Sequence, residues 1–433
     1  MSGLKAGIGR AIITPPIGIP MVGFAGRGPA EGIHDDLLAT ALALESDGAR
    51  ALILAVDLLG VSAEFTGAVR AEVARRCDVP EGNLLLCASH THYGPATDAY
   101  GTSDSPDVAS YLGNLKFLLA GAAQAAVAAL EPARLGFGAG TSTIGVNRRE
   151  RRPDGQIILG QNPAGPCDRE VRVVRLDSAA GVPLAALVNF ACHPVSAASQ
   201  MREISADYVA AMRELVETFA GAACLFLQGA AGNINPVEMR HSFEPARRLG
   251  VMLGGAVATV FENTTTADAA GLAAAAARLD LPAMRFASEE EGEPAVTELR
   301  ANLERLREQG APEGSVYWTE TRLQRAERML AALRGGPPLD PVPAELCALR
   351  FGDIEIVTAP GEIFCETGME VKAASPIART LYAGYSNGTI GYVPVPAAFP
   401  EGGYEVTHAC RVGPEAAGMI AAKSLDLLRQ VAH

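Results

Sequence analysis

The stretch LLLCASHTHYGP, residues 84–95, joins an apolar run to two histidines and a Gly-Pro turn. A short continuous apolar run is typical of a strand that is buried on both faces. Side chains two positions apart on a strand share a face, so we expect His90 and His92 to point the same way at the strand's end. Catalytic and binding groups gather at such ends and in the loops that follow. An isolated His-x-His pair is more often structural, so the other strand ends have to decide.

The regions around this stretch predict an α/β fold. Apolar runs at 51–57 and 83–90 flank a segment, 66–77, that favours a helix. Runs at 169–177 and 183–193 predict two neighbouring strands joined by a turn at Ala180 and Gly181. A strand that enters a glycine-rich loop, 223–233, follows a further helical segment. This alternation, together with the hairpin, predicts a mixed β-sheet core flanked by helices.

The region 289–334 has a different character from the rest of the chain. Leucine and valine recur at helical spacing on both sides of the break GAPEGS, 310–315. The residues of this pattern are Val296, Leu299, Leu303, Leu306, Leu323, Leu330 and Leu333. We predict a helical hairpin over 289–334, inserted into or laid on a single domain that spans 1–433.

Composition excludes several classes of protein. The 433 residues are 48% hydrophobic and 20% charged, which is typical of a globular chain with a large core. A net charge of −13 argues against binding to nucleic acid or to an anionic membrane. No secretory signal or membrane-spanning run is visible, and the eight cysteines have no paired spacing. We therefore expect free thiols, a cytoplasmic location and a small-molecule substrate; a homo-oligomer remains open.

Other predicted strands end in the same kind of residue. NFACHP places His193 at the tip of an apolar run, TAPGE places Glu362 after a Pro-Gly turn, and QGAAGNINP is a loop of small residues. Three of the seven histidines therefore lie at strand ends. Histidines and a carboxylate from separate strands are what a catalytic zinc site requires. Asp57, at the end of the run 51–57, either orients a ligand histidine or caps a helix or turn, and we rank these roles equally.

The order of motifs along nearly the whole chain resembles the catalytic domain of the neutral (non-lysosomal) ceramidase family, which are zinc-dependent amidases. The motifs that carry the resemblance are GIGRAIITPP, MVGFAGR, SHTHYGP, GVNRRE, NFACHPVSA, QGAAGNINP, TAPGE and YSNGTIGYVPVPAAFPEGGYEV. The resemblance implies one Zn²⁺ ion. Its implied ligands are His90, His193, Glu362 and Tyr392.

The resemblance also implies residues that line the reaction centre: His92, Arg148 and Tyr404. In such a site His92 would move a proton, and Arg148 and Tyr404 would stabilise the oxyanion. Asn233 and Asn235, in the loop GNINP, are candidates for substrate binding. In that family the corresponding loop carries a proposed nucleophilic serine, whereas Asn235 stands at its position here. This departure favours a metal-activated water as the attacking group.

The functional expectation is a zinc-dependent hydrolase that cleaves an amide bond of a small soluble metabolite. That family's ceramidases are secretory or membrane-facing and carry a β-rich domain after the catalytic one, and neither feature is evident in this sequence. Ceramide is for that reason a poor expectation as substrate. Two alternatives remain: a zinc-dependent hydrolase of esters or lactones, and a non-catalytic binding protein with the same fold.

Overall fold

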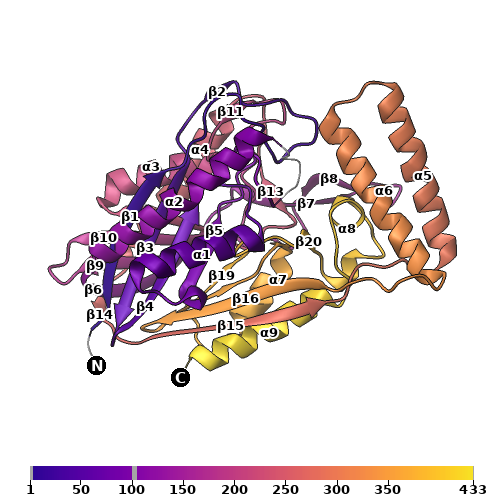
Figure 1. Ribbon diagram of the computed structural model, residues 1–433. Coiled ribbons are helices and arrows are strands. Elements are labelled where there is room, and N and C mark those ends of the chain that lie inside the picture. Colours follow the sequence, from indigo (N-terminus) through magenta and orange to yellow (C-terminus); the bar gives the residue numbers. More distant parts are fainter. Residues whose placement is uncertain (1–2, 100–104, 433) are drawn as a thin grey trace.

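Two β-sheets are stacked face to face, with helices on the outer face of each (Figure 1). The computed structural model describes residues 3–99 and 105–432. One apolar core lies between the larger sheet and its helices, a second lies between the two sheets, and a third lies between the smaller sheet and its helices. The predicted α/β fold, a mixed sheet core flanked by helices, is confirmed.

The larger sheet mixes parallel and antiparallel pairs. Its strands, in spatial order, are β12 (Ala223–Gln228), β10 (Pro183–Phe190), β9 (Glu170–Ser178), β6 (Glu131–Thr141), β1 (Lys5–Ile12), β3 (Leu38–Ser46), β4 (Ala49–Val56) and β5 (Leu84–Ala88), with β14 (Ala267–Asp268) beside β6. The pairs β4–β5 and β10–β12 are parallel. The pair β9–β10 is the antiparallel hairpin expected around Gly181.

The smaller sheet explains why the central strands are apolar throughout. It consists of β15 (Leu272–Leu281), β16 (Val342–Phe351), β17 (Ile354–Thr358) and β19 (Thr380–Ala383). In β5, Leu84 and Leu86 face the helices, whereas Leu85 and Cys87 face the smaller sheet. Both faces of the strand are therefore buried, and alternation of polar and apolar residues disappears. Each buried leucine contributes roughly 1.5–3 kcal/mol to folding.

Helices pack closely on both sheets. The larger sheet carries α1 (Ala63–Cys77), α2 (Pro106–Ala128), α3 (Tyr208–Ala220) and α4 (Glu244–Asn263), and the smaller sheet carries α7 (Cys365–Ala374) and α9 (Ala416–Val431). A Cβ atom on Gly9 of β1 would lie 2.1 Å from the Ala122 carbonyl oxygen of α2. The abundant glycine and alanine thus allow close helix–sheet contact. Within the described part of the chain, no helix is long and apolar enough to cross a membrane.

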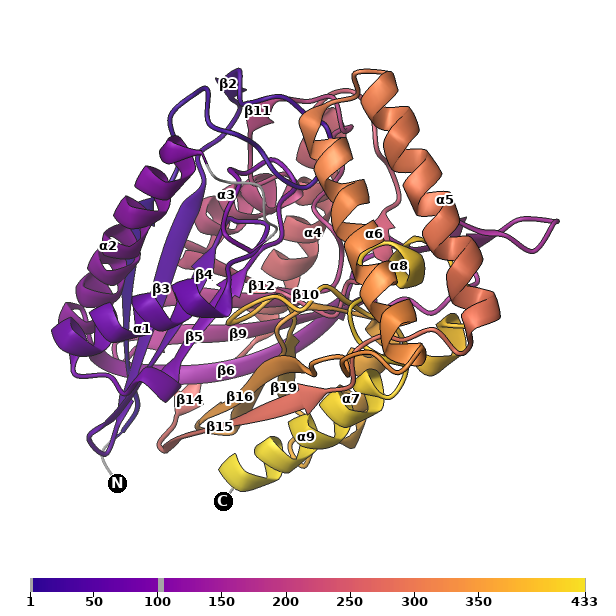
Figure 2. The ribbon, with the colours of Figure 1, turned by 45° about the vertical axis from the view of Figure 1, so that its right-hand side comes forward.

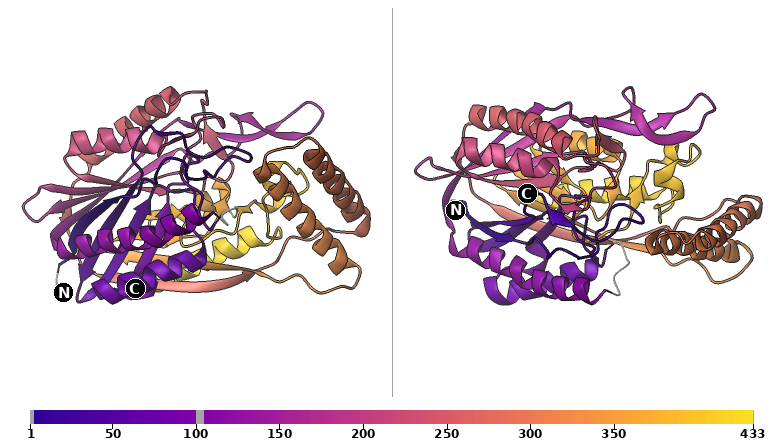
Figure 3. Two further views of the ribbon diagram at one scale, coloured as in Figure 1. Left: turned by 45° about the horizontal axis from the view of Figure 1, so that its top comes forward. Right: turned by 90° about the horizontal axis from the view of Figure 1, so that it is seen from above.

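The predicted helical hairpin is confirmed as α5 (Glu289–Glu308) and α6 (Glu313–Leu333), between the adjacent strands β15 and β16. The hairpin projects from the body, with α5 outside and α6 nearer the sheets (Figures 2 and 3). The buried side chains between the two helices are Val296, Leu303, Leu323, Ala326 and Leu330. The apolar periodicity of this region is therefore satisfied mainly within the hairpin itself.

Short elements at one end of the sheets carry most of the predicted site residues. A three-stranded sheet has the order β13 (Ile234–Pro236), β7 (Gly145–Arg151) and β8 (Ile157–Asn162). Two-stranded sheets pair β18 (Glu362–Ile363) with β20 (Tyr392–Val393), and β2 (Gly32–Ile33) with β11 (Glu203–Ile204). The helix α8 (Tyr404–Thr407) and the 3₁₀ turns Glu81–Asn83 and Pro396–Ala398 complete the described elements.

Candidate metal centre

His90 and His92 meet through a loop and not through strand alternation. The strand β5 ends at Ala88, two residues before His90. His90 has a φ of +67°, in the left-handed region that non-glycine residues rarely adopt. Hydrogen bonds from its own N–H to the Leu58 carbonyl (2.9 Å) and from Ser89 N–H to the Val56 carbonyl (2.9 Å) hold this backbone. The two rings converge, as expected. However, the expectation that strand alternation brings them together was wrong, because both histidines lie in the loop after β5.

All three predicted histidines are oriented in the same way. The Nδ1 atom of His90 lies 2.6 Å from the Leu59 carbonyl oxygen, that of His92 lies 2.9 Å from the Gly23 oxygen, and that of His193 lies 2.7 Å from an oxygen in the glycine-rich loop. A carbonyl oxygen accepts only, so each Nδ1 carries the proton. In the neutral ring the lone pair is then on Nε2. This is the tautomer of a histidine that binds a metal through Nε2.

The Nε2 atoms of these histidines converge. Their ligand atoms lie within 4.8 Å of one another, and the Nε2 atoms of His90 and His92 are 3.3 Å apart. Oε2 of Glu362 lies 3.1 Å from Nε2 of His193 and 3.4 Å from Nε2 of His90. Nitrogen and carboxylate ligand atoms that face one another in a buried site could hold a shared metal ion. The donor set, nitrogen and carboxylate oxygen, fits zinc.

Burial keeps the imidazoles of His92 and His193 neutral. Desolvation, with a smaller contribution from Arg148, lowers the pKa of His193 to about 4. Desolvation and the neighbouring His90 also lower the pKa of His92 well below its ordinary value. Burial alone would raise the pKa of Glu362, but the neighbouring histidines hold it well below its usual range. At neutral pH His92 and His193 are therefore neutral and Glu362 is anionic, which are the protonation states that bind a metal.

Glu362 and Tyr392 are brought together by a strand pair. The two residues are direct partners in the parallel pair β18–β20, and each is buried. The ring of Tyr392 lies 5.2 Å below the guanidinium carbon of Arg148. Parallel pairing of two short strands thus delivers two residues, thirty positions apart, to the same place. This arrangement is compatible with the predicted role of both as ligands.

The glycine-rich loop after β12 positions the ligands. The carbonyl of Ala231 accepts the Nδ1 proton of His193, and the backbone of Gly232 lies against Glu362. A Cβ atom on Gly232 would come within 2.3 Å of the Glu362 carbonyl oxygen. The small residues of this loop therefore allow backbone to reach the metal site from the inside, between two predicted ligands.

Arg148 lies at the centre of a buried hydrogen-bond network. Its Nε donates to Oε1 of Glu405 at 2.7 Å, and its Nη1 donates to Oδ1 of Asn235 at 3.1 Å. Nη1 is also 3.4 Å from Nε2 of His193. Nη2 is buried and has no hydrogen-bond partner among the described residues. Burial opposes the charge, but Tyr392 and Glu405 hold the pKa of Arg148 well above its ordinary value.

Tyr404 borders this network on α8. Its ring stands edge-on to that of Tyr392 at 5.7 Å and is stacked with the ring of His408 at 5.2 Å. Tyr404 is 39% exposed, whereas Tyr392 is 4% exposed. The two tyrosines are therefore in contact, with Tyr404 at the surface and Tyr392 buried among the predicted ligands.

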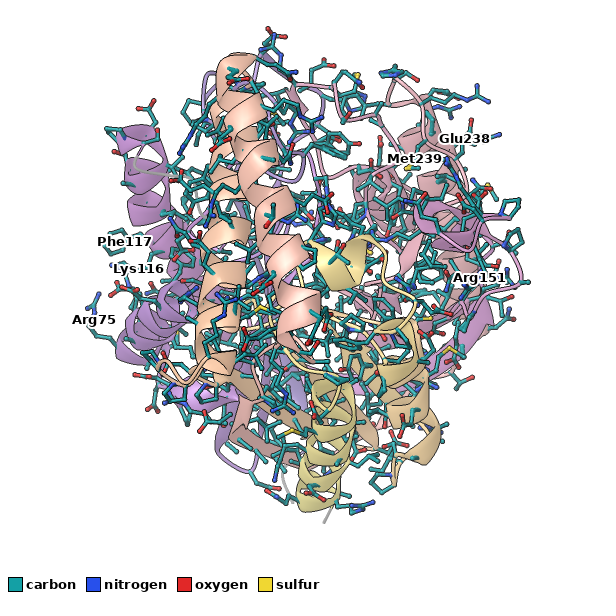
Figure 4. The ribbon with its side chains drawn as sticks, turned by 90° about the vertical axis from the view of Figure 1, so that its right-hand side faces the viewer. Arg75, Lys116, Phe117, Arg151, Glu238 and Met239 are labelled. Carbon is teal, nitrogen blue, oxygen red and sulfur yellow. The ribbon has the colours of Figure 1, made fainter. Side chains whose placement is uncertain are left out.

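The other candidates Asp57 and Asn233, and the neighbouring Arg151, bond to other parts of the protein. Asp57 accepts hydrogen bonds from the Leu38 N–H (2.9 Å) and the Arg213 guanidinium (2.7 Å), so neither suggested role describes it. Asn233 bonds through both ends of its amide to the start of α7 at 2.8 and 2.9 Å. Arg151, near the edge of the view in Figure 4, pairs with Glu401 at 2.6 Å.

Two contributors were missed from the sequence. Glu405 is fully buried and pairs with Arg148 and Arg149 at 2.7 and 2.9 Å. Arg27 donates to the carbonyl oxygen of His92 at 2.7 Å and so holds the loop that carries this histidine. Both residues stand within motifs already quoted, GGYEV and MVGFAGR. The sequence does not show which residue a single charged side chain will pair with. The only indication that Glu405 and Arg27 belong to the site is that they lie within these motifs.

The fold has known counterparts. No family model matches this chain, and no curated protein sequence matches it. Among solved structures, it is similar to neutral ceramidase from Pseudomonas aeruginosa, with a TM-score of 0.75 and 20% identity over 99% of this chain and 74% of that one. A structure described as ceramidase complexed with C2 matches with a TM-score of 0.75 and 19% identity, over 99% of this chain and 75% of that one. The protein has a ceramidase-like fold.

Proposed function

We propose that the protein is a zinc-dependent hydrolase that cleaves the amide bond of a small soluble metabolite. The observation that carries the proposal is the convergence of three histidines, each with its Nε2 atom directed inward, near the carboxylate of Glu362. The ceramidase-like fold supports amide cleavage, because the solved structures that share it are named for an amidase. We also propose that 1–433 is one catalytic domain, into which 289–334 is inserted.

In this proposal the zinc ligands are His90, His193, Glu362 and Tyr392. When bound, zinc would supply Lewis acidity. It would polarise a carbonyl group and lower the pKa of water, so that the water can lose a proton and attack near neutral pH. His92 is the least buried of the three histidines. We therefore assign it a different role: it accepts a proton from the attacking water and passes it to the leaving amine.

Arg148 and Tyr404 stabilise the negative charge that develops on the carbonyl oxygen. The buried Nη2 of Arg148 has no partner among the described residues and is the available donor. One such donor is worth roughly 3 kcal/mol of transition-state stabilisation. Asn235 orients Arg148 through its amide oxygen. Since an asparagine amide cannot form an acyl-enzyme, the proposal assigns the attack to water.

The test combines metal analysis with a substrate screen. Purified protein should contain close to one zinc per chain by mass spectrometry, and chelation should abolish hydrolysis. The screen compares short N-acyl amines, the matching esters and lactones, and ceramide in detergent. Faster turnover of esters or lactones would favour the alternative hydrolase, faster turnover of ceramide would reject the small-metabolite proposal, and absence of bound metal would reject the mechanism.

A further inference from the structure

The helix α6 connects the two sides of the metal site. At its beginning, a Cβ atom on Gly26 would lie 2.9 Å from the Ser315 hydroxyl oxygen, so the helix lies against the loop that holds His92. Further along, Arg325 donates to the carbonyl oxygens of Cys410 and His408 at 2.8 and 3.0 Å. These contacts fix α6 to the segment that follows Tyr404. Figure 2 shows α8 drawn in front of α6, and the contacts of Arg325 with the segment 408–410 place this part of α6 near the end of α8.

The helix α6 carries a row of polar residues beside its apolar contact with α5. Leu323, Ala326 and Leu330 pack against α5. Ser315, Thr319 and Arg322 recur at four- and three-residue intervals, so they line up along the helix next to these apolar residues. This row begins at the contact with Gly26 and lies beside the anchoring residue Arg325. The Thr319 hydroxyl donates to the Ser315 carbonyl oxygen at 2.9 Å, so the guanidinium of Arg322 is the charged group of this row.

Arg322 is the charged residue of this polar row. Its Nε is buried and has no hydrogen-bond partner among the residues that the structure describes. Burial lowers its pKa, and the nearby Tyr404 and Glu298 raise it. The same proximity acts on Tyr404, where burial raises the pKa and Arg322 opposes that rise. Arg322 lies one turn before Arg325, which bonds to the carbonyl oxygen of His408, and the ring of His408 stacks on Tyr404. These contacts bring this part of α6 to the outermost tyrosine of the proposed reaction centre.

Neighbouring arginines are already committed to protein partners. Arg325 is bonded to two carbonyl groups, and Arg149 to Glu401 and Glu405. Arg148 is bonded to Glu405 and Asn235, and its remaining Nη2 is assigned to the carbonyl oxygen of the scissile amide. A buried guanidinium Nε without a partner costs free energy, which an anion that accepts its proton recovers. In a chain with a net charge of −13, an unpaired cation at this position selects among substrates by charge.

We propose that Arg322 binds a carboxylate of the substrate and that α6 is the selective wall of the metal site. This inference rests on the proposed amide hydrolysis and adds the class of substrate, a short amide that bears a carboxylate. Nε and one Nη of Arg322 hold the two carboxylate oxygens, while the scissile carbonyl lies further in, toward Arg148.

The experiment uses the full-length, zinc-loaded protein and three amides of similar size. N-butanoylglycine carries its carboxylate on the amine side, the mono-propylamide of glutaric acid carries it on the acyl side, and N-propylbutanamide is neutral. The variants are Arg322→Gln, Arg322→Lys and the control Arg328→Gln, which removes the same charge from an exposed position of α6. KM and kcat are measured for each pair, and binding of the carboxylate amides is measured by calorimetry.

We expect Arg322→Gln to raise KM for one of the two carboxylate amides roughly 10-fold or more, with kcat and the neutral amide little changed. Arg322→Lys should give an intermediate KM, and Arg328→Gln should behave as the unaltered protein. If Arg322→Gln and the unaltered protein have equal KM values for both carboxylate amides, the role of Arg322 is rejected and the proposed function stands. If no amide is cleaved, the proposed function fails, and calorimetry then decides: equal affinities in Arg322→Gln and unaltered protein reject the role of Arg322.

Discussion

Nε of Arg148 donates a 2.7 Å hydrogen bond to Oε1 of Glu405, and this contact joins β7 to α8. Both side chains are almost fully buried. Because Glu405 directly follows Tyr404, the carboxylate that orients the guanidinium also fixes the segment that presents the tyrosine. Two proposed oxyanion donors are therefore positioned by one buried residue, Glu405.

Glu405→Gln tests this arrangement. The amide keeps the shape of the side chain but loses its charge, so Arg148 is less firmly held and less well compensated. Removing one partner of a buried ion pair costs roughly 3–5 kcal/mol of stability, and we expect kcat to fall by about 10²-fold with zinc content unchanged. The control is Glu401→Gln, whose carboxylate pairs with Arg149 and Arg151 nearer the surface. Loss of zinc in Glu405→Gln would show that Glu405 acts through the ligands instead.

Separate alanine variants distinguish the roles of the three histidines. His193→Ala should lose zinc, because its Nε2 lies next to Glu362 and its ring is fully buried. His92→Ala should keep zinc and lose about 10²–10⁴-fold in kcat, the usual worth of a general base. Elemental analysis of both proteins, prepared in parallel, checks the prediction. If His92→Ala also loses zinc, the metal has three histidine ligands and the proton acceptor is another residue.

Asn235 should matter for orientation and not for covalent chemistry. Asn235→Ala removes the 3.1 Å acceptor of the Arg148 Nη1 proton, so we expect kcat to fall about 10-fold, the value of one hydrogen bond to a charged group. Serine-directed acylating reagents should leave activity intact, whereas chelators should abolish it. Mass spectrometry of protein quenched during turnover offers the decisive comparison, since a covalent acyl adduct on any residue contradicts a direct attack by water.

The metal-free protein should lose stability on mild acidification. Burial lowers the folded-state pKa of His193 to about 4, against an ordinary value of 6.5, so the unfolded chain binds more protons between these values. Stability therefore falls as the pH drops through this window, by about 2 kcal/mol between pH 7 and pH 5 for this group. Urea unfolding of the chelated protein measures the loss. His193→Gln should reduce it, whereas His241→Gln, at an exposed position, should not.

Much of the fold was readable from the sequence because burial leaves a local pattern. The run at 84–88 is apolar on both faces since β5 lies between helices and a second sheet. The hairpin 289–334 was predicted almost to its ends, since its leucines pack mainly on one another. The stacking of two sheets was not predicted, because no local pattern says which of two apolar faces meets which partner.

For the candidate site, too, part could be predicted from the sequence and part depended on the tertiary structure. The sequence by itself determined that histidines and a carboxylate follow separate strands, and the motif order indicated His90, His193, Glu362 and Tyr392. Only the tertiary structure decided that His90 turns inward through a left-handed backbone, that Asn233 serves α7, and that Glu405 pairs with Arg148. Residue types and their spacing can be read directly from the sequence. The partner of a side chain, in contrast, depends on contacts between segments that are far apart in sequence. Hydrogen bonds and charge pairs act over a few ångströms of space, whatever the number of residues between them.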